Sequence, residues 1–374
     1  MKKILLAAAF AGAAALASCG GNKGGVTMGS LSSFDSLSYA LGANMGYGID
    51  YQMKDIPFDF AAVDRGIKEA ATGKSSLNHD DAVERLRDYF MNKRGERARA
   101  IAAERAAADS VRLASGDSTK VEYPVADQAM FESEEEREEV SYAFGNDIGY
   151  NLAENNLPIH VVWVGKALCD VQEGNAKMSE DEVRSYLQYY FMVKLPAQNK
   201  EASESWLNKI EKKSGVEKTE SGLLYKVIDA GDESMMPKDD RDVVKVHYTG
   251  RTREGKVFDT SVFANRPEAQ QEMLRKHRPD MFEEDGTPKA DEPVEFPLNR
   301  VIKGWTEGMK LVGKGGKIML WIPAELAYGT QAPSREIGPN EALEFEVELI
   351  DVTPYEEPAP AAEEDKTTDA AVEE

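Results

Sequence analysis

Four short runs in the C-terminal part of the chain contain the side chains best suited to chemistry. They are Val246-His247-Tyr248-Thr249-Gly250, Val257-Phe258-Asp259-Thr260-Ser261, Val301-Ile302-Lys303-Gly304-Trp305 and Leu326-Ala327-Tyr328-Gly329. Together they supply aromatic rings and one carboxylate, without a pairing of nucleophile and base. The histidines of the chain share no metal-ligand spacing, so we expect neither a metal nor a cofactor. Taken singly, each aromatic residue is typical of a packed core.

The order and the residues of the four runs closely resemble those of the FKBP-type peptidyl-prolyl cis-trans isomerases. The resemblance extends from about Gly222 to Val352. It implies a half-barrel antiparallel sheet wrapped against one short helix, and an enzyme that isomerises the peptide bond before proline. Each ring taken singly would be interpreted as core packing, but the occurrence of all four motifs in the family's order favours a pocket.

The chemistry that this resemblance implies breaks no bond. Rotation about an X-Pro amide has a barrier of about 18–20 kcal/mol because twisting destroys resonance. The amide dipole falls as the bond twists, so an apolar cavity penalises the planar ground state more than the transition state. A difference of about 4 kcal/mol would speed rotation on the order of a thousandfold.

The resemblance also assigns the pocket residues. They are Tyr248, Phe258, Asp259, Val301, Ile302, Trp305, Tyr328, Ile337 and Phe345. Trp305 is expected to form the floor beneath the proline ring, with Tyr248, Phe258 and Phe345 as walls. The Ile302 backbone N–H and the Tyr328 hydroxyl are expected to donate to substrate carbonyls. Asp259 is expected to orient Tyr248 or to polarise the site.

Three features depart from the family pattern. Residues 262–292 form an insertion with a helix-like stretch from Pro267 to Leu274, and the sequence leaves its role open. Val294 stands where many relatives have an aromatic residue, which opens one wall. The flap of residues 331–338 is more polar than is typical, so Ile337 is the pocket residue with the least support.

Alternating patterns predict the strands that must position the pocket. Three sets of apolar residues alternate with polar ones and should each share a buried face: Val244, Val246 and Tyr248; Ile318, Leu320 and Ile322; Leu343, Phe345, Val347 and Leu349. An amphipathic sheet must cover its apolar face, and the short segment after Trp305 is the natural cover. We therefore predict an α+β fold, with this sheet preceded by an all-α region of two repeated helical units.

An internal repeat predicts those two units. Tyr39-Ala40-Leu41-Gly42-Ala43-Asn44-Met45-Gly46-Tyr47 recurs 103 residues later as Tyr142-Ala143-Phe144-Gly145-Asn146-Asp147-Ile148-Gly149-Tyr150. Three later landmarks keep an offset of 101: Pro57 with Pro158, Gly73 with Gly174, and Tyr89-Phe90-Met91 with Tyr190-Phe191-Met192. The glycines lie four residues apart on one helix face, which allows a second helix to approach closely.

The last helix of each copy is expected to be long. In the first copy it should start at Asp80-Asp81 and continue to about Leu113. In the second copy it should run from about Ser179 towards Lys213, with Pro196 expected to kink or interrupt it.

The helical copies resemble the N-terminal dimerisation segment of FKBP-type isomerases of the bacterial envelope, in which helices of two subunits interlace. This chain carries the segment twice, so one copy could complement the other within a single chain. We hypothesise an internal pseudo-dimer, and a homodimer is the rival arrangement.

The N-terminus has the form of an export signal. Lys2 and Lys3 precede an apolar run that is too short to span a bilayer. The run ends in Leu16-Ala17-Ser18-Cys19, which resembles a bacterial lipobox and implies cleavage before a lipidated Cys19. An ordinary cleaved signal with an incidental cysteine is the alternative. Gly20 is compatible with an outer-membrane anchor facing the periplasm, and display on the cell surface stays open.

Composition limits the partners. A net charge of −22, with 45 basic against 67 acidic residues, disfavours nucleic acid as a partner.

If Cys19 is lipidated, Cys169 has no disulfide partner, and its helical surroundings predict a buried, inert thiol. The expected partners are proline-containing unfolded or partly folded polypeptides and, through Cys19, a membrane. A holdase-type chaperone or peptide-binding module with weak isomerase activity is the alternative function.

The predicted organisation follows the chain in order. It comprises a signal peptide (1–18), a tether (19–33), the first helical repeat (34–114), a linker (115–136), the second repeat with a long connecting helix (137–213), the isomerase domain (214–353) and an acidic, disordered tail (354–374).

Overall fold

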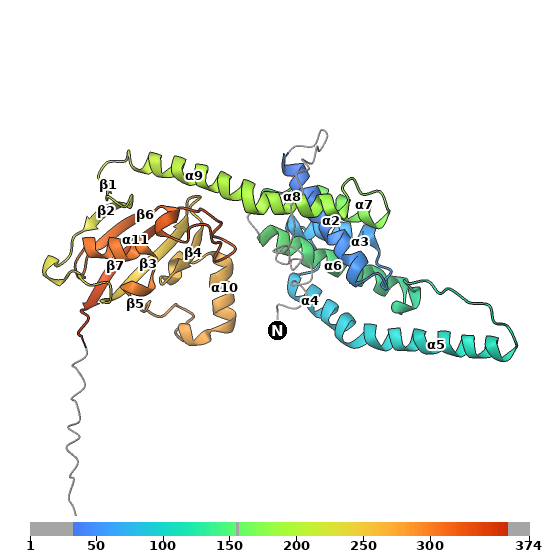
Figure 1. Cartoon of the computed structure of the whole chain (residues 1–374). Coiled ribbons are helices and arrows are strands. Elements are labelled where there is room, and N and C mark those ends of the chain that lie inside the picture. The colour runs from blue at the N-terminus through green and yellow to red at the C-terminus, as the bar shows by residue number, and fades with distance from the viewer. Residues whose placement is uncertain (1–32, 155–156, 358–374) are drawn as a thin grey trace, which may run out of the picture. The chain divides into compact units, whose positions relative to one another are not determined.

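The computed structural model describes residues 33–154 and 157–357 of the chain. The predicted signal peptide, Cys19 and most of the acidic tail lie outside these residues. The chain divides into two compact units, Met1–Pro196 and Ala197–Glu374. The first is helical and the second is built on an antiparallel sheet (Figure 1), which confirms the predicted α+β class.

One order of helices occurs twice, and the last helix of the second copy continues into the second unit. The first repeat contains α2 (Ser33–Gln52), α3 (Phe60–Ala71), α4 (His79–Asp88), a π-helical segment (Tyr89–Lys93) and α5 (Arg94–Ala114). The second contains α6 (Glu134–Glu154), α7 (Val161–Gln172), α8 (Glu180–Tyr189), a π-helical segment (Tyr190–Lys194) and α9 (Leu195–Ile210). A short 3-10 helix, Gln128–Met130, lies between them.

The sequence predicted that Pro196 kinks or interrupts the last helix, and the interruption does not occur. Pro196 is the second residue of α9 and lies two residues after the end of a π-helical segment, whose widened turn accommodates a residue without an N–H donor. The first repeat has the same π-helical segment, with Gly95 in place of the proline. The widened turn is therefore a property of the repeat and not of Pro196.

Each repeat packs its first helix on the other repeat. Helix α2 lies against α7 and α8, whereas α6 lies against α3 and α4 (Figure 1). A Cβ placed on Gly42 would lie 2.0 Å from the Val164 carbonyl oxygen, and one on Gly145 would lie 2.0 Å from the Val63 carbonyl oxygen. The close helix approach predicted from the glycine spacing therefore occurs twice, at equivalent places.

Hydrogen bonds between the repeats follow the same symmetry. Ser38 Oγ accepts from the His160 N–H at 2.8 Å, and Ser141 Oγ accepts from the Asp59 N–H at 2.9 Å. The Tyr39 hydroxyl donates to Asp170 at 3.1 Å. Its equivalent, the Tyr142 hydroxyl, donates to Glu69 at 2.6 Å. The contacts between the repeats are thus related by a pseudo-twofold pattern.

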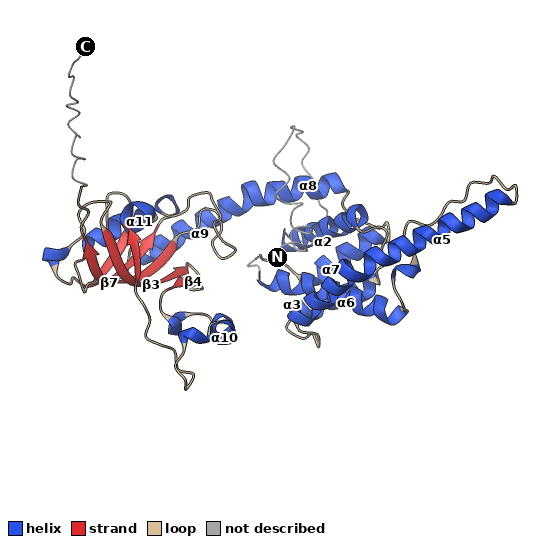
Figure 2. Cartoon of the chain, turned by 90° about the horizontal axis from the view of Figure 1, so that it is seen from below, coloured by secondary structure: helices blue, strands red, loops and turns tan. Residues whose placement is uncertain are grey.

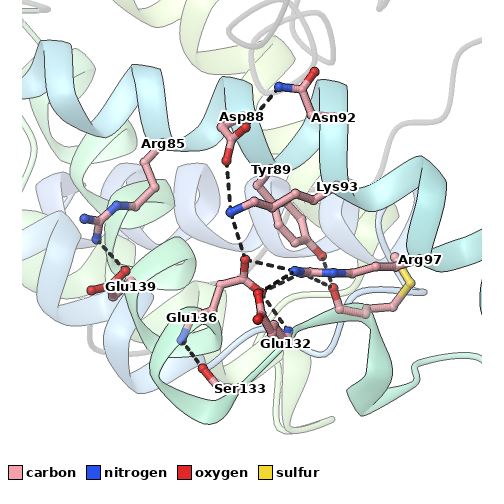
Figure 3. Close-up of polar contacts among 11 residues, drawn as sticks. Arg85, Asp88, Tyr89, Asn92, Lys93, Arg97, Glu132, Ser133, Glu136 and Glu139 are labelled. Atoms are coloured by element: carbon pink, nitrogen blue, oxygen red, sulfur yellow. Dashed lines mark hydrogen bonds and ion pairs between the residues drawn. The ribbon is translucent and has the colours of Figure 1, made fainter.

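A polar network joins α5 to the start of α6 (Figure 3). Glu136 accepts two hydrogen bonds from Arg97, at 2.5 and 3.1 Å, and one from Lys93 at 3.2 Å. The Glu132 N–H donates to it at 2.7 Å. Burial by itself would raise the pKa of Glu136, but these hydrogen bonds outweigh it and lower that pKa. Glu136 is therefore ionised at neutral pH and fixes the path of the chain between the repeats.

The second unit contains one antiparallel sheet. Its strands are β1 (Glu217–Lys218), β2 (Leu224–Asp229), β3 (Val243–Thr252), β4 (Val257–Thr260), β5 (Val294–Pro297), β6 (Lys317–Ile322) and β7 (Leu343–Thr353). They run in the order β1-β2-β6-β7-β3-β4, and β5 pairs with the first half of β3. Figure 2 shows β7, β3 and β4 next to one another in this sheet. The long central pair of β3 and β7 carries pocket residues on both strands.

Helices cover both faces of this sheet. The predicted alternation is confirmed, because Leu343, Phe345, Val347 and Leu349 are all buried on one face. Helix α11 (Lys303–Gly308) packs on that face, where Gly304 lies against Ile322. On the other face, Trp206 and Ile210 of α9 pack with Trp321.

The thiol of Cys169 lies on α7. Cys169 is only partly buried, which corrects the prediction of a buried thiol. Burial nevertheless raises its pKa to about 11, so little reactive thiolate exists at neutral pH. None of the helices within residues 33–154 and 157–357 is both long and apolar enough to span a bilayer.

Candidate active site

The structure brings the predicted pocket residues together at the sheet face under α11. Trp305, Ile337 and Phe345 belong to the buried core of this unit. Five others pack against it and remain partly accessible: Tyr248, Phe258, Val301, Ile302 and Tyr328. Asp259, the ninth, is exposed on β4 at the rim. Residues from the four motif runs, together with Ile337 and Phe345, thus share one region.

Trp305 lies at the centre of a group of perpendicular rings. It is only 4% exposed, and its ring centroid lies 5.3 Å from those of Tyr248 and Phe345, at interplanar angles of 85°. Edge-to-face contacts of this kind hold aromatic rings in fixed orientations. The indole Nε1 is buried without a hydrogen-bond partner among the described residues, which costs about 1–3 kcal/mol. Such a cost is unusual for a residue that serves packing alone.

A glycine allows the two phenylalanine walls to meet. The Phe258 and Phe345 ring centroids are 5.6 Å apart, at an interplanar angle of 88°. A Cβ on Gly250, in the middle of β3, would lie 2.7 Å from both rings. The glycine of the Tyr248-Thr249-Gly250 run is therefore required by this close approach.

Asp259 and the turn after it position Tyr248. The Tyr248 hydroxyl donates to Asp259 Oδ2 at 2.7 Å. Ser261 Oγ accepts from the Tyr248 N–H at 2.9 Å, and Thr260 Oγ1 donates to the Tyr248 carbonyl at 2.8 Å. Burial and the Asp259 carboxylate raise the pKa of Tyr248, so its phenol stays protonated and its proton is committed to Asp259.

Two other donors near the rings have no hydrogen-bond partner in the part of the chain that the structure describes. The Tyr328 hydroxyl makes no hydrogen bond within the described part of the chain, and burial raises its pKa, which keeps it protonated. The Ile302 N–H likewise donates to no backbone acceptor among the described residues, while the Ile302 carbonyl accepts from Trp305. The region thus presents apolar rings together with two available hydrogen-bond donors.

Sequence reasoning missed two residues of this region. Phe296 on β5 places its ring 5.8 Å from Tyr248 and 5.7 Å from Trp305, beside the position where Val294 suggested an open wall. The alternation of Val294 and Phe296 on one strand could have indicated it. Arg266 donates from Nη2 to the Thr260 carbonyl at 2.8 Å, and its charge opposes the rise in the pKa of Tyr248.

The insertion of residues 262–292 is anchored beside the site. It contains α10 (Glu268–His277), and the Asn265 side chain donates to Thr249 Oγ1 at 2.9 Å. The Phe263 and Phe282 rings pack edge to face at 5.4 Å, and Arg275 lies over Phe263 at 5.3 Å. These contacts give the insertion a small ordered core of its own.

Comparison with known families matches both parts of the chain. Residues 235–350 match the family described as FKBP-type peptidyl-prolyl cis-trans isomerase. Residues 34–117 and 137–227 each match the family described as the domain amino terminal to FKBP-type peptidyl-prolyl isomerase. The two latter matches coincide with the two helical repeats.

Similar proteins are found in several bacteria. The chain is 41% identical over 160 residues to a probable FKBP-type peptidyl-prolyl cis-trans isomerase of Haemophilus influenzae, over 43% of this chain and 55% of that protein. It is 33% identical over 261 residues to the FKBP-type peptidyl-prolyl cis-trans isomerase FkpA of Escherichia coli, over 65% of this chain and 83% of that protein. It is 30% identical over 228 residues to the outer membrane protein MIP of Legionella longbeachae, over 58% of this chain and 86% of that protein.

Proposed function

Because this chain belongs to the FKBP-type peptidyl-prolyl cis-trans isomerases, we propose that its aromatic region is the pocket in which X-Pro bonds of client polypeptides isomerise. The observation that carries the proposal is the perpendicular packing of Tyr248 and Phe345 around a buried Trp305, whose Nε1 has no hydrogen-bond partner within residues 33–154 and 157–357. A pocket of rings with few fixed donors suits a reaction in which no bond is broken.

The apolar rings act on the amide dipole. A planar X-Pro amide loses hydration when its proline ring enters the pocket, and it regains no equivalent polar contact from Trp305 or Phe345. The twisted amide has a smaller dipole and loses less. The barrier to rotation therefore falls without an acid, a base or a nucleophile.

The available donors hold one side of the bond. We assign the Ile302 N–H to a carbonyl of the substrate chain and the Tyr328 hydroxyl to the carbonyl of the twisting bond. Tyr248 is committed to Asp259 and serves as a rigid wall. One part of the substrate is thus fixed while the rest rotates.

Deletion of the Tyr328 hydroxyl tests this assignment. Tyr328→Phe should lower kcat/KM for a proline-containing peptide by about tenfold, which corresponds to one hydrogen bond made in the transition state. Tyr225→Phe is the matched control, because the Tyr225 hydroxyl donates to Glu217 in an exposed hydrogen bond and is not among the proposed pocket residues. Wild-type protein without isomerase activity that still suppresses aggregation of a proline-free client would instead favour the holdase alternative.

The two helical repeats form, in this proposal, a pseudo-dimer closed within one chain. The exchange of α2 and α6 between repeats, with equivalent contacts at Gly42 and Gly145, supports it. Each repeat supplies the partner surface that a single copy would need from a second molecule. Sedimentation of the full chain distinguishes this arrangement from a homodimer.

The chain is also proposed to be a lipoprotein of the bacterial envelope. Support comes from the lipobox-like residues ending at Cys19 and from similarity to a relative named an outer membrane protein. An anchor in the outer membrane, with the catalytic unit in the periplasm, would place the enzyme among newly exported polypeptides. The intact mass of the mature protein should correspond to a chain starting at an acylated Cys19. A mass equal to an unmodified chain would contradict this.

A further inference from the structure

Helix α9, which belongs to the second unit from Ala197 onward, carries a polar pair as well as apolar residues on its buried face. Asn199 and Ser203 lie one turn apart on the face that also carries Trp206 and Ile210. Their side chains are among the few buried polar groups of the helix, with Asn199 8% and Ser203 4% exposed. Buried polar groups are retained where they have specific partners.

The partners of this pair are backbone groups of one short loop. Ser203 Oγ donates to the Asn340 carbonyl at 2.9 Å and accepts from the Ala342 N–H at 3.0 Å. Asn199 Nδ2 donates to the Pro339 carbonyl at 3.0 Å. Two side chains of α9 therefore fix the backbone at three of the four residues 339–342.

A buried ion pair strengthens the same junction. Arg253, in the turn between β3 and β4, donates to Glu341 at 2.6 Å, and Glu341 is 7% exposed. The Asn199 Oδ1 lies 3.5 Å from an Arg253 guanidinium nitrogen. The helix, the turn and the loop thus meet around Glu341.

This loop directly follows residues 331–338, the flap expected from the family resemblance. Ile337, which is buried in the pocket cluster, lies two residues before Pro339, and Phe345 follows on β7. The Asn340 N–H donates to the Gly329 carbonyl at 2.7 Å, next to Tyr328. Asn340 also has a φ of 57°, the only positive value at a non-glycine position in the described ranges 33–154 and 157–357.

We propose that Asn199 and Ser203 are positioning residues of the isomerase, which set the flap so that Ile337 and Tyr328 face the substrate. The inference rests on the proposed pocket and adds a helix that lies outside residues 235–350, within the match to the amino-terminal domain. In this arrangement α9 contributes to catalysis and is not only a connector.

Ser203→Ala in the full-length protein tests the proposal. Loss of the hydroxyl should lower kcat/KM for a proline-containing peptide about fivefold, as expected for one net hydrogen bond. Ser205→Ala is the matched control, since Ser205 is exposed on the same helix, and it should keep wild-type activity. Ser203→Thr retains a hydroxyl and should recover most of the activity.

Two additional measurements separate positioning from mere stability. The methyl NMR signal of Ile337 should shift in Ser203→Ala and not in Ser205→Ala. Gly338→Ala and Asn199→Ala should both lower kcat/KM and shift the Ile337 signal. A Cβ at Gly338 would lie 2.7 Å from Asn199 Nδ2 and would displace this side chain from the loop. Activity and Ile337 signals equal to wild type in folded Ser203→Ala would overturn this inference alone. An inactive wild-type protein would instead overturn the proposed function.

Discussion

Replacement of Gly42 with valine should destabilise the helical unit by about 3 kcal/mol or more, because overpacking here meets backbone and cannot be relieved by a side chain. A Cβ at this position would lie 2.0 Å from the Val164 carbonyl oxygen. Gly145→Val should have a similar effect, since its Cβ would lie 2.0 Å from the Val63 oxygen. Urea unfolding followed by circular dichroism measures both changes.

Gly48→Ala is the control for this prediction. Gly48 lies on the same helix α2, and a Cβ there meets nothing within 4 Å, so alanine should stabilise the helix by about 0.5–1 kcal/mol. The wild-type chain, prepared without the proposed lipid anchor, should sediment as a monomer. A stable dimer at nanomolar concentration, or Gly42→Val with wild-type stability, would contradict the closed pseudo-dimer.

Local patterns explain why much of the fold could be predicted. Alternation identified the buried faces of β3, β6 and β7, since the side-chain period of a strand is fixed by its geometry. The sequence offset between Gly42 and Gly145 identified the repeat, and α5 ends at Ala114, one residue after the predicted end. These features depend on neighbouring residues and leave a direct trace in the sequence.

Other features depend on contacts between distant residues. The π-helical turn before Pro196 could not be predicted from the proline, because the first repeat forms the same turn with Gly95 at the equivalent position. Phe296 enters the aromatic group only through the pairing of β5 with β3. The contact of Ser203 with Asn340 spans more than a hundred residues, and no periodic pattern marks either partner.

The resemblance of four motifs predicted which residues form the candidate site. The geometry of these residues could not be predicted from the motifs. The motifs name Trp305 and Tyr248, yet the perpendicular arrangement of their rings follows from how α11 packs on the sheet. Arg266 was missed because it lies in the insertion, where the family pattern gives no guide.

Trp305→Leu should have the largest effect on catalysis. Leucine keeps the floor apolar but removes the ring that Tyr248, Phe296 and Phe345 contact at their edges. The proline ring would then lose its flat support, and kcat/KM should fall on the order of a hundredfold, which equals about 2.7 kcal/mol of transition-state stabilisation. Coupled proteolysis of a proline-containing peptide measures the loss.

A tryptophan outside the pocket controls for general damage. Trp163 lies in the helical unit, where Lys177 stacks over its ring at 5.4 Å, and Trp163→Leu should retain isomerase activity. Urea unfolding of the catalytic unit should show that Trp305→Leu remains folded under the assay conditions. An activity loss of equal size in both variants would indicate a nonspecific effect.

The central claim is that a pocket of aromatic rings lowers the barrier to prolyl rotation. Exchange NMR spectroscopy of a short X-Pro peptide measures this rotation directly, with the full chain present at a small fraction of the peptide concentration. The cis and trans signals should interconvert faster in proportion to the wild-type protein, and Trp305→Leu should abolish most of that acceleration. An exchange rate unchanged by the wild-type protein, or accelerated equally by folded Trp305→Leu, would contradict the claim.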